Sequence, residues 1–181
     1  MLHLKNITAG NPKTAEQYQM TKRHSIAWLF SEDGKNWYEE QKNFASDTIK
    51  VAYNERGRVV WVGKDVTGIE PTNVSIIELP DITANRRITA PGFWFYRDGN
   101  FIFDYKLQAE YVRDALLKQV SITTSEWEKD LLLGLISDED REKLKAWRIY
   151  AKELQAMDLS TITGKATYNA INWPERPDAA A

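Results

Sequence analysis

Residue types that carry nucleophilic and acid–base chemistry are sparse in this sequence. Its two histidines, His3 and His24, lie near neither a Gly-x-Ser-x-Gly motif nor a cysteine, because the 181 residues include no cysteine. No Gly-x-x-x-x-Gly-Lys stretch is present to bind the phosphates of a nucleotide. The two carboxylates of a glycoside-cleaving pair can lie far apart in a sequence, but no particular pair stands out here. We therefore expect a protein that is not an enzyme, without catalytic residues or a cofactor.

One acidic cluster, Asp138-Glu139-Asp140, raises the question of a metal ion. It lacks the glycine and the distal glutamate of a calcium-binding loop. It follows Ser137, a favourable residue for the N-cap of a helix, and the helix dipole stabilises negative charge in the first turn. The cluster therefore predicts the start of a helix, and we expect no metal site.

The overall composition argues against several classes of protein. Lys and Arg number 24 and Asp and Glu number 26, so the formal charge of −2 gives no electrostatic reason to bind nucleic acid. No apolar run approaches the roughly 20 residues of a membrane span, and the first residues lack the pattern of a signal peptide. The absence of cysteine is consistent with a reducing cytosol. We expect no nucleic-acid partner and no membrane insertion.

Aromatic residues are unusually frequent, with seven Trp, eight Tyr and six Phe. In a small protein this predicts a compact aromatic core or a binding surface. The plainest pattern is a hairpin in which residues 93–96 and 101–105 flank a turn at 97–100. Its rings cannot all point inward. Either its second face packs against another segment, or the rings form an exposed patch for a partner.

The first half of the chain has the patterns of β-strands around one short helix. An irregular leader precedes Thr14, which is expected to cap a helix through Met20. The dipeptide Asp33-Gly34 predicts a turn, followed by a polar return segment at 37–42. The segment 59–62 is apolar on both faces, which predicts a central place in the sheet. The predicted strands are residues 25–30, 48–53, 59–62 and 74–79.

The second half changes to the period of a helix. From Leu107, one apolar stripe consists of Tyr111, Ala115, Val120, Trp127, Leu131 and Leu135. After a bend at Gly134 and Ser137, a second stripe consists of Leu144, Trp147, Ala151 and Leu154. A striped helix cannot bury its apolar side alone, so we expect an antiparallel helical hairpin. The expected packing residues of this arm are Trp127, Leu131, Leu144, Trp147 and Leu154.

Two prolines end regular structure near the end of the chain. There, Ile171, Trp173 and Pro174 are expected to anchor an extended tail. The sequence thus predicts the α+β class, with an antiparallel aromatic-rich β domain at 1–105, a helical hairpin arm at 106–158 and an extended tail at 159–181. An aromatic β domain without an enzymatic site suggests a protein that acts by holding another protein.

Three stretches of the chain carry recognisable motifs. The first runs from residue 3 to residue 51, the second from 80 to 99, and the third from 144 to 177. Among the motifs are His3-Leu4-Lys5-Asn6-Ile7, Trp28-Leu29-Phe30-Ser31-Glu32-Asp33-Gly34, Asn85-Arg86-Arg87, Trp147-Arg148-Ile149-Tyr150 and Ile171-Asn172-Trp173-Pro174-Glu175-Arg176-Pro177. In these motifs and their order, the chain resembles the tail fibre assembly proteins of Mu-like and lambdoid tailed phages.

The resemblance implies a chaperone for the C-terminal tip of a trimeric phage tail fibre. Such proteins help the fibre to fold and trimerise in the cytoplasm of the host cell, and some remain on the fibre tip of the virion. We expect the β domain to hold the fibre through residues that could equally belong to its core, namely Trp28, Trp37, Tyr38, Phe44 and Trp61. One alternative is a carbohydrate-binding adhesin that recognises host lipopolysaccharide, since aromatic rings stack on sugars. Another is a purely structural component of the virion.

Overall fold

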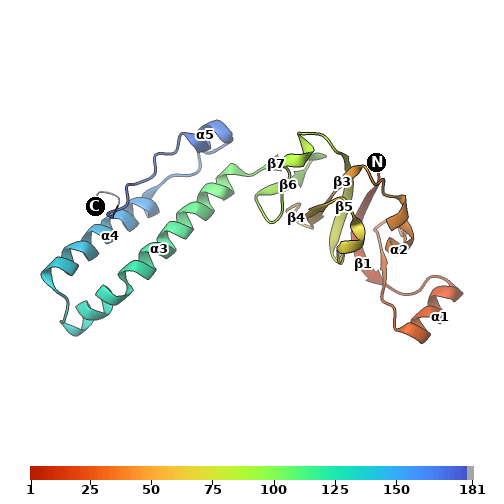
Figure 1. The fold of residues 1–181 in the computed structure, drawn as a ribbon, viewed down its shortest axis with the longest axis horizontal. Coiled ribbons are helices and arrows are strands. Elements are labelled where there is room, and N and C mark those ends of the chain that lie inside the picture. Colours follow the sequence, from red (N-terminus) through yellow and green to blue (C-terminus); the bar gives the residue numbers. More distant parts are fainter. Residues whose placement is uncertain (179–181) are drawn as a thin grey trace. The chain divides into compact units, whose positions relative to one another are not determined.

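The computed structural model describes residues 1–178 and divides the chain into two compact units. The first unit comprises Met1–Phe103 and contains every β-strand found within the described residues, and the second begins at Asp104 and contains the long helices (Figure 1). The strands are antiparallel, so the predicted α+β class is confirmed. Within residues 1–178, no helix combines the length and the apolar character needed to cross a membrane.

A five-stranded antiparallel sheet forms the centre of the first unit. Its order is β2-β1-β5-β3-β4, so β5 lies in the middle, between β1 and β3. The strands are β1 (His3–Gly10), β2 (Trp28–Phe30), β3 (Thr48–Asn54), β4 (Val59–Gly63) and β5 (Val74–Pro80). The predicted strands at 48–53, 59–62 and 74–79 are confirmed within one residue at each end.

The residues expected to form an irregular leader form β1 instead. This strand pairs with both β5 and β2, and it buries Leu4 and Ile7 completely. A register shift between these two residues, with Asn6 at a φ of 46°, breaks the alternation of period two that would have marked a strand in the sequence. The strand therefore depends on pairing with distant residues, which in β5 lie between 67 and 74 positions further along the chain.

The first predicted hairpin is only partly present. Thr14 caps α1 (Ala15–His24) as expected, but the helix continues to His24, so β2 is shorter than the predicted strand at 25–30. The turn at Asp33-Gly34 exists, and one bridge joins Phe30 to Asn36. The predicted return segment is wrong. Asn36 accepts a hydrogen bond from the Tyr38 amide and caps the short helix α2 (Trp37–Glu40).

The position of β4 also differs from the prediction, because this strand lies at an edge of the sheet and not in its centre. Its apolar residues face two separate clusters on opposite faces of the sheet. Val59 and Val62 pack with Ile88 on one face, and Trp61 packs with the cluster of Val66 on the other. Apolar residues on both faces of a strand therefore show that both faces are covered, which an edge strand can also achieve.

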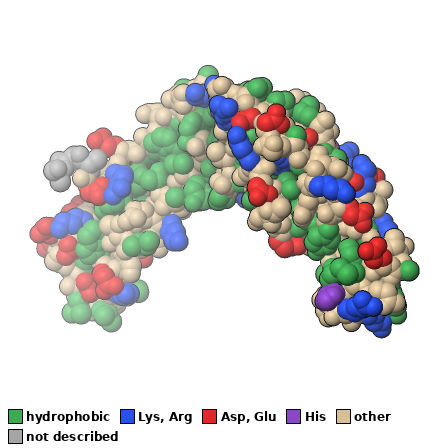
Figure 2. Space-filling model, turned by 45° about the vertical axis from the view of Figure 1, so that its right-hand side comes forward, with side chains coloured by type: hydrophobic (Ala, Val, Ile, Leu, Met, Phe, Trp, Pro, Cys, Tyr) green, Lys and Arg blue, Asp and Glu red, His purple; other side chains and the backbone are tan. Residues whose placement is uncertain are grey.

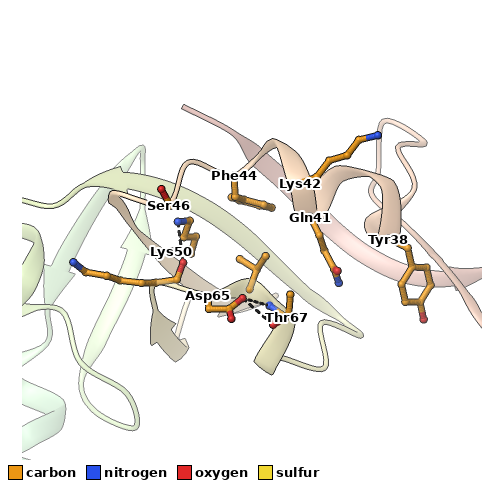
Figure 3. A pocket seen from close by; sticks show the side chains of 10 residues that line it. Tyr38, Gln41, Lys42, Phe44, Ser46, Lys50, Asp65 and Thr67 are labelled. Carbon is orange, nitrogen blue, oxygen red and sulfur yellow. Dashed lines mark hydrogen bonds between the residues drawn. The ribbon is translucent and has the colours of Figure 1, made fainter.

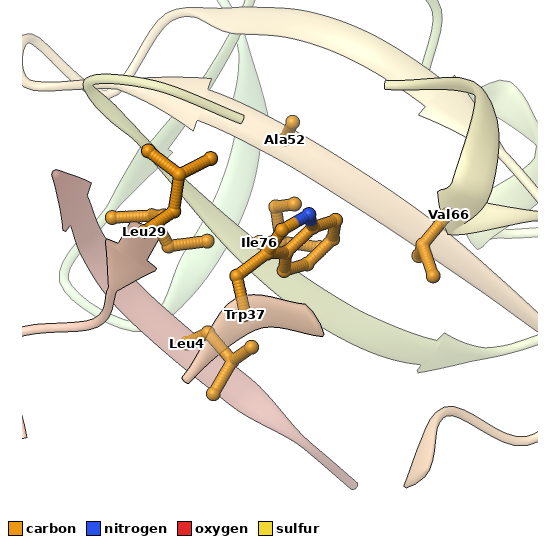
Figure 4. Packing of buried hydrophobic residues seen from close by; sticks show 7 residues of the cluster. Leu4, Leu29, Trp37, Ala52, Val66 and Ile76 are labelled. Atoms are coloured by element: carbon orange, nitrogen blue, oxygen red, sulfur yellow. The ribbon is translucent and has the colours of Figure 1, made fainter. Parts of the chain in front are cut away.

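Two buried clusters lie on the two faces of the sheet. In the first, Trp37 is 1% exposed and is enclosed by Leu4, Leu29, Ala52, Ile7, Val66 and Ile76 (Figure 4). The second is built around Ile49, Val51, Val59 and Ile88. Three short 3-10 helices connect the strands: η1 (Gln41–Asn43), η2 (Val66–Gly68) and η3 (Asn85–Arg87). The predicted aromatic hairpin is confirmed as β6 (Trp94–Arg97) and β7 (Asn100–Phe103).

The second unit is the predicted antiparallel helical hairpin. It consists of α3 (Tyr105–Leu133) and α4 (Asp138–Ala156), which lie side by side (Figure 1). The Asp104 side chain caps α3, Gly134 ends it at a φ of 72°, and Ser137 caps α4 through a hydrogen bond from the Asp140 amide. The four predicted core residues of α4 are buried: Leu144, Trp147, Ala151 and Leu154.

The stripe predicted for α3 is correct in its middle and wrong at its ends. Val120 is buried and Trp127 packs against α4, but Tyr111, Ala115, Leu131 and Leu135 are exposed. At about 100° per residue, Tyr111 lies about 180° from Val120 and therefore on the opposite side of the helix. Leu131 lies on the same side as Val120, but it is near the end of α3 and remains exposed.

The segment after α4 was predicted to be extended, and it contains one short helix, α5 (Lys165–Asn169). Leu159 and Ile162 are buried together with Ala109 of α3. Ile171 and Trp173 both pack against this cluster of Ala109, Leu159 and Ile162. Trp173 also packs against the cluster between α3 and α4. Two apolar anchors hold the segment against the helices.

Candidate binding groove

The first unit has an open groove between α2–η1 and the turn at η2 (Figure 3). Its volume is about 560 Å³. Tyr38 and Phe44 provide aromatic surface, and the lysines at positions 42 and 64 provide positive charge. The lining residues are Tyr38, Gln41, Lys42, Phe44, Ser46, Lys50, Lys64, Asp65, Val66 and Thr67.

One wall of the groove is held by a buried carboxylate. Glu78 of β5 is 5% exposed and accepts hydrogen bonds from the Leu2 amide at 3.0 Å, the Ala45 amide at 2.7 Å and the Thr48 hydroxyl at 2.8 Å. Burial raises the pKa of Glu78, but these hydrogen bonds and the nearby charge of Lys50 outweigh burial and hold the pKa below its ordinary value. The segment that carries Phe44 is therefore fixed to the middle of the sheet.

The other wall is held by a buried ammonium group. Lys50 of β3 is 1% exposed, and its Nζ donates to the carbonyl oxygens of Ala45, Thr48 and Lys64, the last at 2.9 Å. Lys50 thus links both sides of the groove. At the start of η2, Asp65 accepts hydrogen bonds from the amide and the hydroxyl of Thr67, which lower the pKa of its carboxyl group.

Two of the five residues predicted to bind a partner line this groove, namely Tyr38 and Phe44. Tyr38 is 46% exposed and forms an edge-to-face pair with the half-buried Trp28, with ring centroids 5.9 Å apart. The hydroxyl of Tyr38 donates to the carbonyl oxygen of Ala27, and the indole nitrogen of Trp28 donates to Thr21. These contacts fix both rings at the surface next to α2.

The other two predicted residues are mainly packing residues. Trp37 lies inside the core, so it offers no surface to a partner in this conformation. Trp61 is half-buried, and its ring lies along β4 over Gly63, where an added Cβ would be 2.4 Å from the ring. The roles of Lys50 and Glu78 were not predicted from the sequence. The available signal was one charged residue inside each of two strongly apolar strands, which is costly unless the charge is paired or hydrogen-bonded.

The second unit carries a different exposed surface. At the turn between α3 and α4, Leu132, Leu133 and Leu135 are 87%, 71% and 72% exposed, and Leu131 is 47% exposed. Figure 2 shows hydrophobic side chains together at this end of the hairpin, beside acidic ones. We call the four leucines the leucine tip. Of the predicted packing residues of the arm, Trp127, Trp147 and Leu154 belong to the cluster between the helices, Leu144 is buried, and Leu131 belongs to the tip.

Titratable clusters suited to metal binding are absent from residues 1–178, where no group of three or more His, Asp or Glu side chains is arranged to hold an ion. An open groove with fixed aromatic rings and a cationic rim is instead typical of a surface that binds another polypeptide.

Comparison with known proteins agrees with this class. The model of a family described as Caudovirales tail fibre assembly protein, lambda gpK, matches residues 39–178. The chain is 46% identical to tail fiber assembly protein U′ of Escherichia phage Mu and 45% identical to the protein of the same name from Escherichia phage P1. It is 40% identical to tail fiber assembly protein U of phage Mu. Each alignment covers 98% of this chain and 100% of the relative. The chain therefore belongs to the tail fibre assembly protein family, and the resemblance found in the sequence is confirmed.

Proposed function

We propose that this protein is a chaperone that binds the C-terminal tip of a phage tail fibre and promotes its folding and trimerisation. The names of its relatives support a role in tail fibre assembly. The observation that carries the finer proposal is the groove. In it, Tyr38 is exposed and fixed by a hydrogen bond, and the half-buried Phe44 packs against Trp37. The buried groups Lys50 and Glu78 hold the walls. We expect this assembly step to occur in the host cytoplasm.

The physical basis of the proposal is burial of apolar surface. A fibre tip that has not yet trimerised exposes apolar side chains and unpaired strand edges, both of which lead to aggregation. A preformed groove can cover such a segment without the entropy cost of ordering its own walls. Burial of apolar surface supplies favourable free energy for binding, so the proposal involves no nucleotide hydrolysis. The leucine tip offers a second apolar surface, through which the helical arm adds contact with the fibre or with another copy of the arm.

The test is coexpression of the chain with the C-terminal part of its fibre. A Tyr38→Ser, Phe44→Ala double variant removes two rings from the groove, and we expect a loss of soluble trimeric fibre of about tenfold or more. The matched control is Tyr18→Ser, which replaces a tyrosine of similar exposure on α1. Size-exclusion chromatography with light scattering gives the amount and the mass of the complex. An unchanged yield of trimer with the double variant contradicts the proposed role of the groove.

A second candidate function is binding of host lipopolysaccharide by a chaperone that stays on the fibre tip. The observation in its favour is the edge-to-face pair of the half-buried Trp28 and the exposed Tyr38, since aromatic rings at a surface stack on sugars. Direct binding of the isolated chain to purified lipopolysaccharide, lost in a Tyr38→Ser variant and retained in Tyr18→Ser, supports this function. Detection of the chain in purified virions tests whether it remains there.

A further inference from the structure

Strand β4 leaves most of one backbone edge unpaired. Its inner side pairs with β3, and at its start the carbonyl oxygen of Gly57 accepts the Tyr96 amide at 2.7 Å, next to a bridge between Arg58 and Phe95. Beyond this point, no strand within residues 1–178 pairs with the outer side of Val60–Gly63. The opposite edge of the sheet, β2, has three residues, and the bridge from Phe30 to Asn36 covers its end.

The composition of this edge is unusual for a soluble protein. Natural edge strands are commonly protected from pairing by lysine, by proline or by a covering segment. Val60-Trp61-Val62-Gly63 contains no charged residue and no proline, and Val60 is 43% exposed. An edge of this kind pairs readily with another extended chain, so a partner that covers it in the assembled state accounts for its composition.

Hollows on both faces of the sheet meet this edge at the same end. The binding groove lies on the face of Lys50 and Trp61, and its wall begins at Lys64, directly after β4. On the other face is a second hollow of about 320 Å³, lined by Ile49, Val62, Gly63, Lys64, Asp81 and Arg86. Lys64 lines both. Because alternate side chains of a strand point to opposite faces, an added strand beside β4 would direct successive side chains into the two hollows.

We propose that Val60–Gly63 pairs with an extended segment of the tail fibre chain, which adds a strand to the sheet. Main-chain hydrogen bonds to β4 provide affinity, and the two hollows select alternate side chains of the segment. The chemistry of the hollows defines that segment. Phe44 and Val66 accept an apolar side chain. Lys64 and Arg86 both pair with Asp81, which leaves one net positive charge in the second hollow. Together with Lys42 in the groove, that charge favours an acidic residue close to the apolar one. This inference rests on the proposed function, since it names how the fibre is held.

Residue-resolved amide exchange tests the proposal. Amides of the free chain and of its complex with the C-terminal part of the fibre are compared by NMR. On binding, we expect alternate amides between Val60 and Lys64 to exchange at least about tenfold more slowly, because only the outward amides gain a partner. If these amides are protected in the free chain, and the protection increases with the concentration of the chain, two copies pair with each other. That result overturns the assignment of the edge to the fibre.

A complex that forms fully while these amides exchange as in the free chain overturns the proposal and leaves the proposed chaperone function intact. Failure of any complex to form refutes both. As a second measurement, the residue whose amide gains protection is replaced by Pro, which removes the outward donor, and by Thr, which keeps it. We expect the Pro variant to bind the fibre at least about tenfold more weakly than the Thr variant. Equal affinity of the two variants, with both folded by circular dichroism, also overturns the proposal.

Discussion

Lys50 and Glu78 face each other in the register of β3 and β5, and both reach the same short segment of chain. Glu78 accepts a hydrogen bond from the amide of Ala45, and Lys50 donates a hydrogen bond to the carbonyl oxygen of Ala45. Both side chains are almost completely buried, and no buried polar side-chain atom within the described part of the chain lacks a hydrogen-bond partner. Two opposite charges in the sheet thus position the loop that forms one wall of the groove.

Replacing Lys50 by Met is expected to lower the free energy of unfolding of the first unit by about 3 kcal/mol, because it leaves the carbonyl oxygens of Ala45 and Lys64 without their buried donor. It also removes a positive charge close to the buried carboxylate of Glu78. Urea denaturation measures the change. Lys35→Met is the matched control, since this lysine pairs with Asp33 at the surface and its loss has little effect. Equal stability of the two variants contradicts the structural role of Lys50.

Glu78 is expected to make the first unit sensitive to acid. Its pKa is lowered from the ordinary value of 4.5 in the folded state, so its contribution to stability is complete above that value and is lost as the pH falls through the lowered pKa. A Glu78→Gln variant is less stable at neutral pH and loses less stability on acidification. Urea denaturation between about pH 2 and pH 7 compares the two proteins. Parallel pH profiles of the variant and the unsubstituted protein contradict this assignment.

Gly57→Ala is expected to break the junction between β4 and β6. An added Cβ would lie 2.3 Å from the Tyr96 carbonyl oxygen, and the φ of 78° disfavours any other residue. Gly99→Ala is the matched control, because its φ is 82° and no atom lies within 4 Å of the added Cβ. The control isolates the conformational penalty of about 1 kcal/mol, and Gly57→Ala is expected to cost at least about twice as much. Thermal unfolding of both variants measures the difference.

Changes to the leucine tip are expected to affect association and not stability. Replacing Leu132 and Leu133 by Ser removes two side chains that are 87% and 71% exposed, so the free energy of unfolding changes by less than about 0.5 kcal/mol. We expect weaker binding of a hydrophobic dye, measured by fluorescence. We also expect less self-association at high concentration, measured by sedimentation. The control is Leu154→Ala in the core of the hairpin, which costs at least about 2 kcal/mol. A large loss of stability in the Ser variant contradicts the exposed position of the tip.

Features coded by adjacent residues could be predicted from the sequence. The caps at Thr14 and Ser137, the glycine that ends α3 and the turn of the β6–β7 hairpin were all identified in this way. The core face of α4 was correct because its stripe keeps the helical period.

Features that depend on distant residues could not be predicted. Strand β1 exists through pairing across the sheet, and the neighbours of β4 decide whether an apolar strand is central or at an edge. The groove could be predicted only in part. Tyr38 and Phe44 were found as aromatic residues, but burial of Trp37 depends on strands far from it in the sequence. The roles of Lys50 and Glu78 depend on the register of β3 and β5, which the separate strand patterns do not specify.

The hydrogen bonds of Glu78 also set an order of events during translation. This carboxylate joins Leu2 and Ala45, which precede it by 76 and 33 positions. A nascent chain that has not yet released residue 78 from the ribosome has no central strand for β1 and β3 to pair with, and nothing to fasten the wall of the groove. The proposed fibre-binding groove therefore matures late in synthesis of the first unit, after Glu78 has left the ribosome.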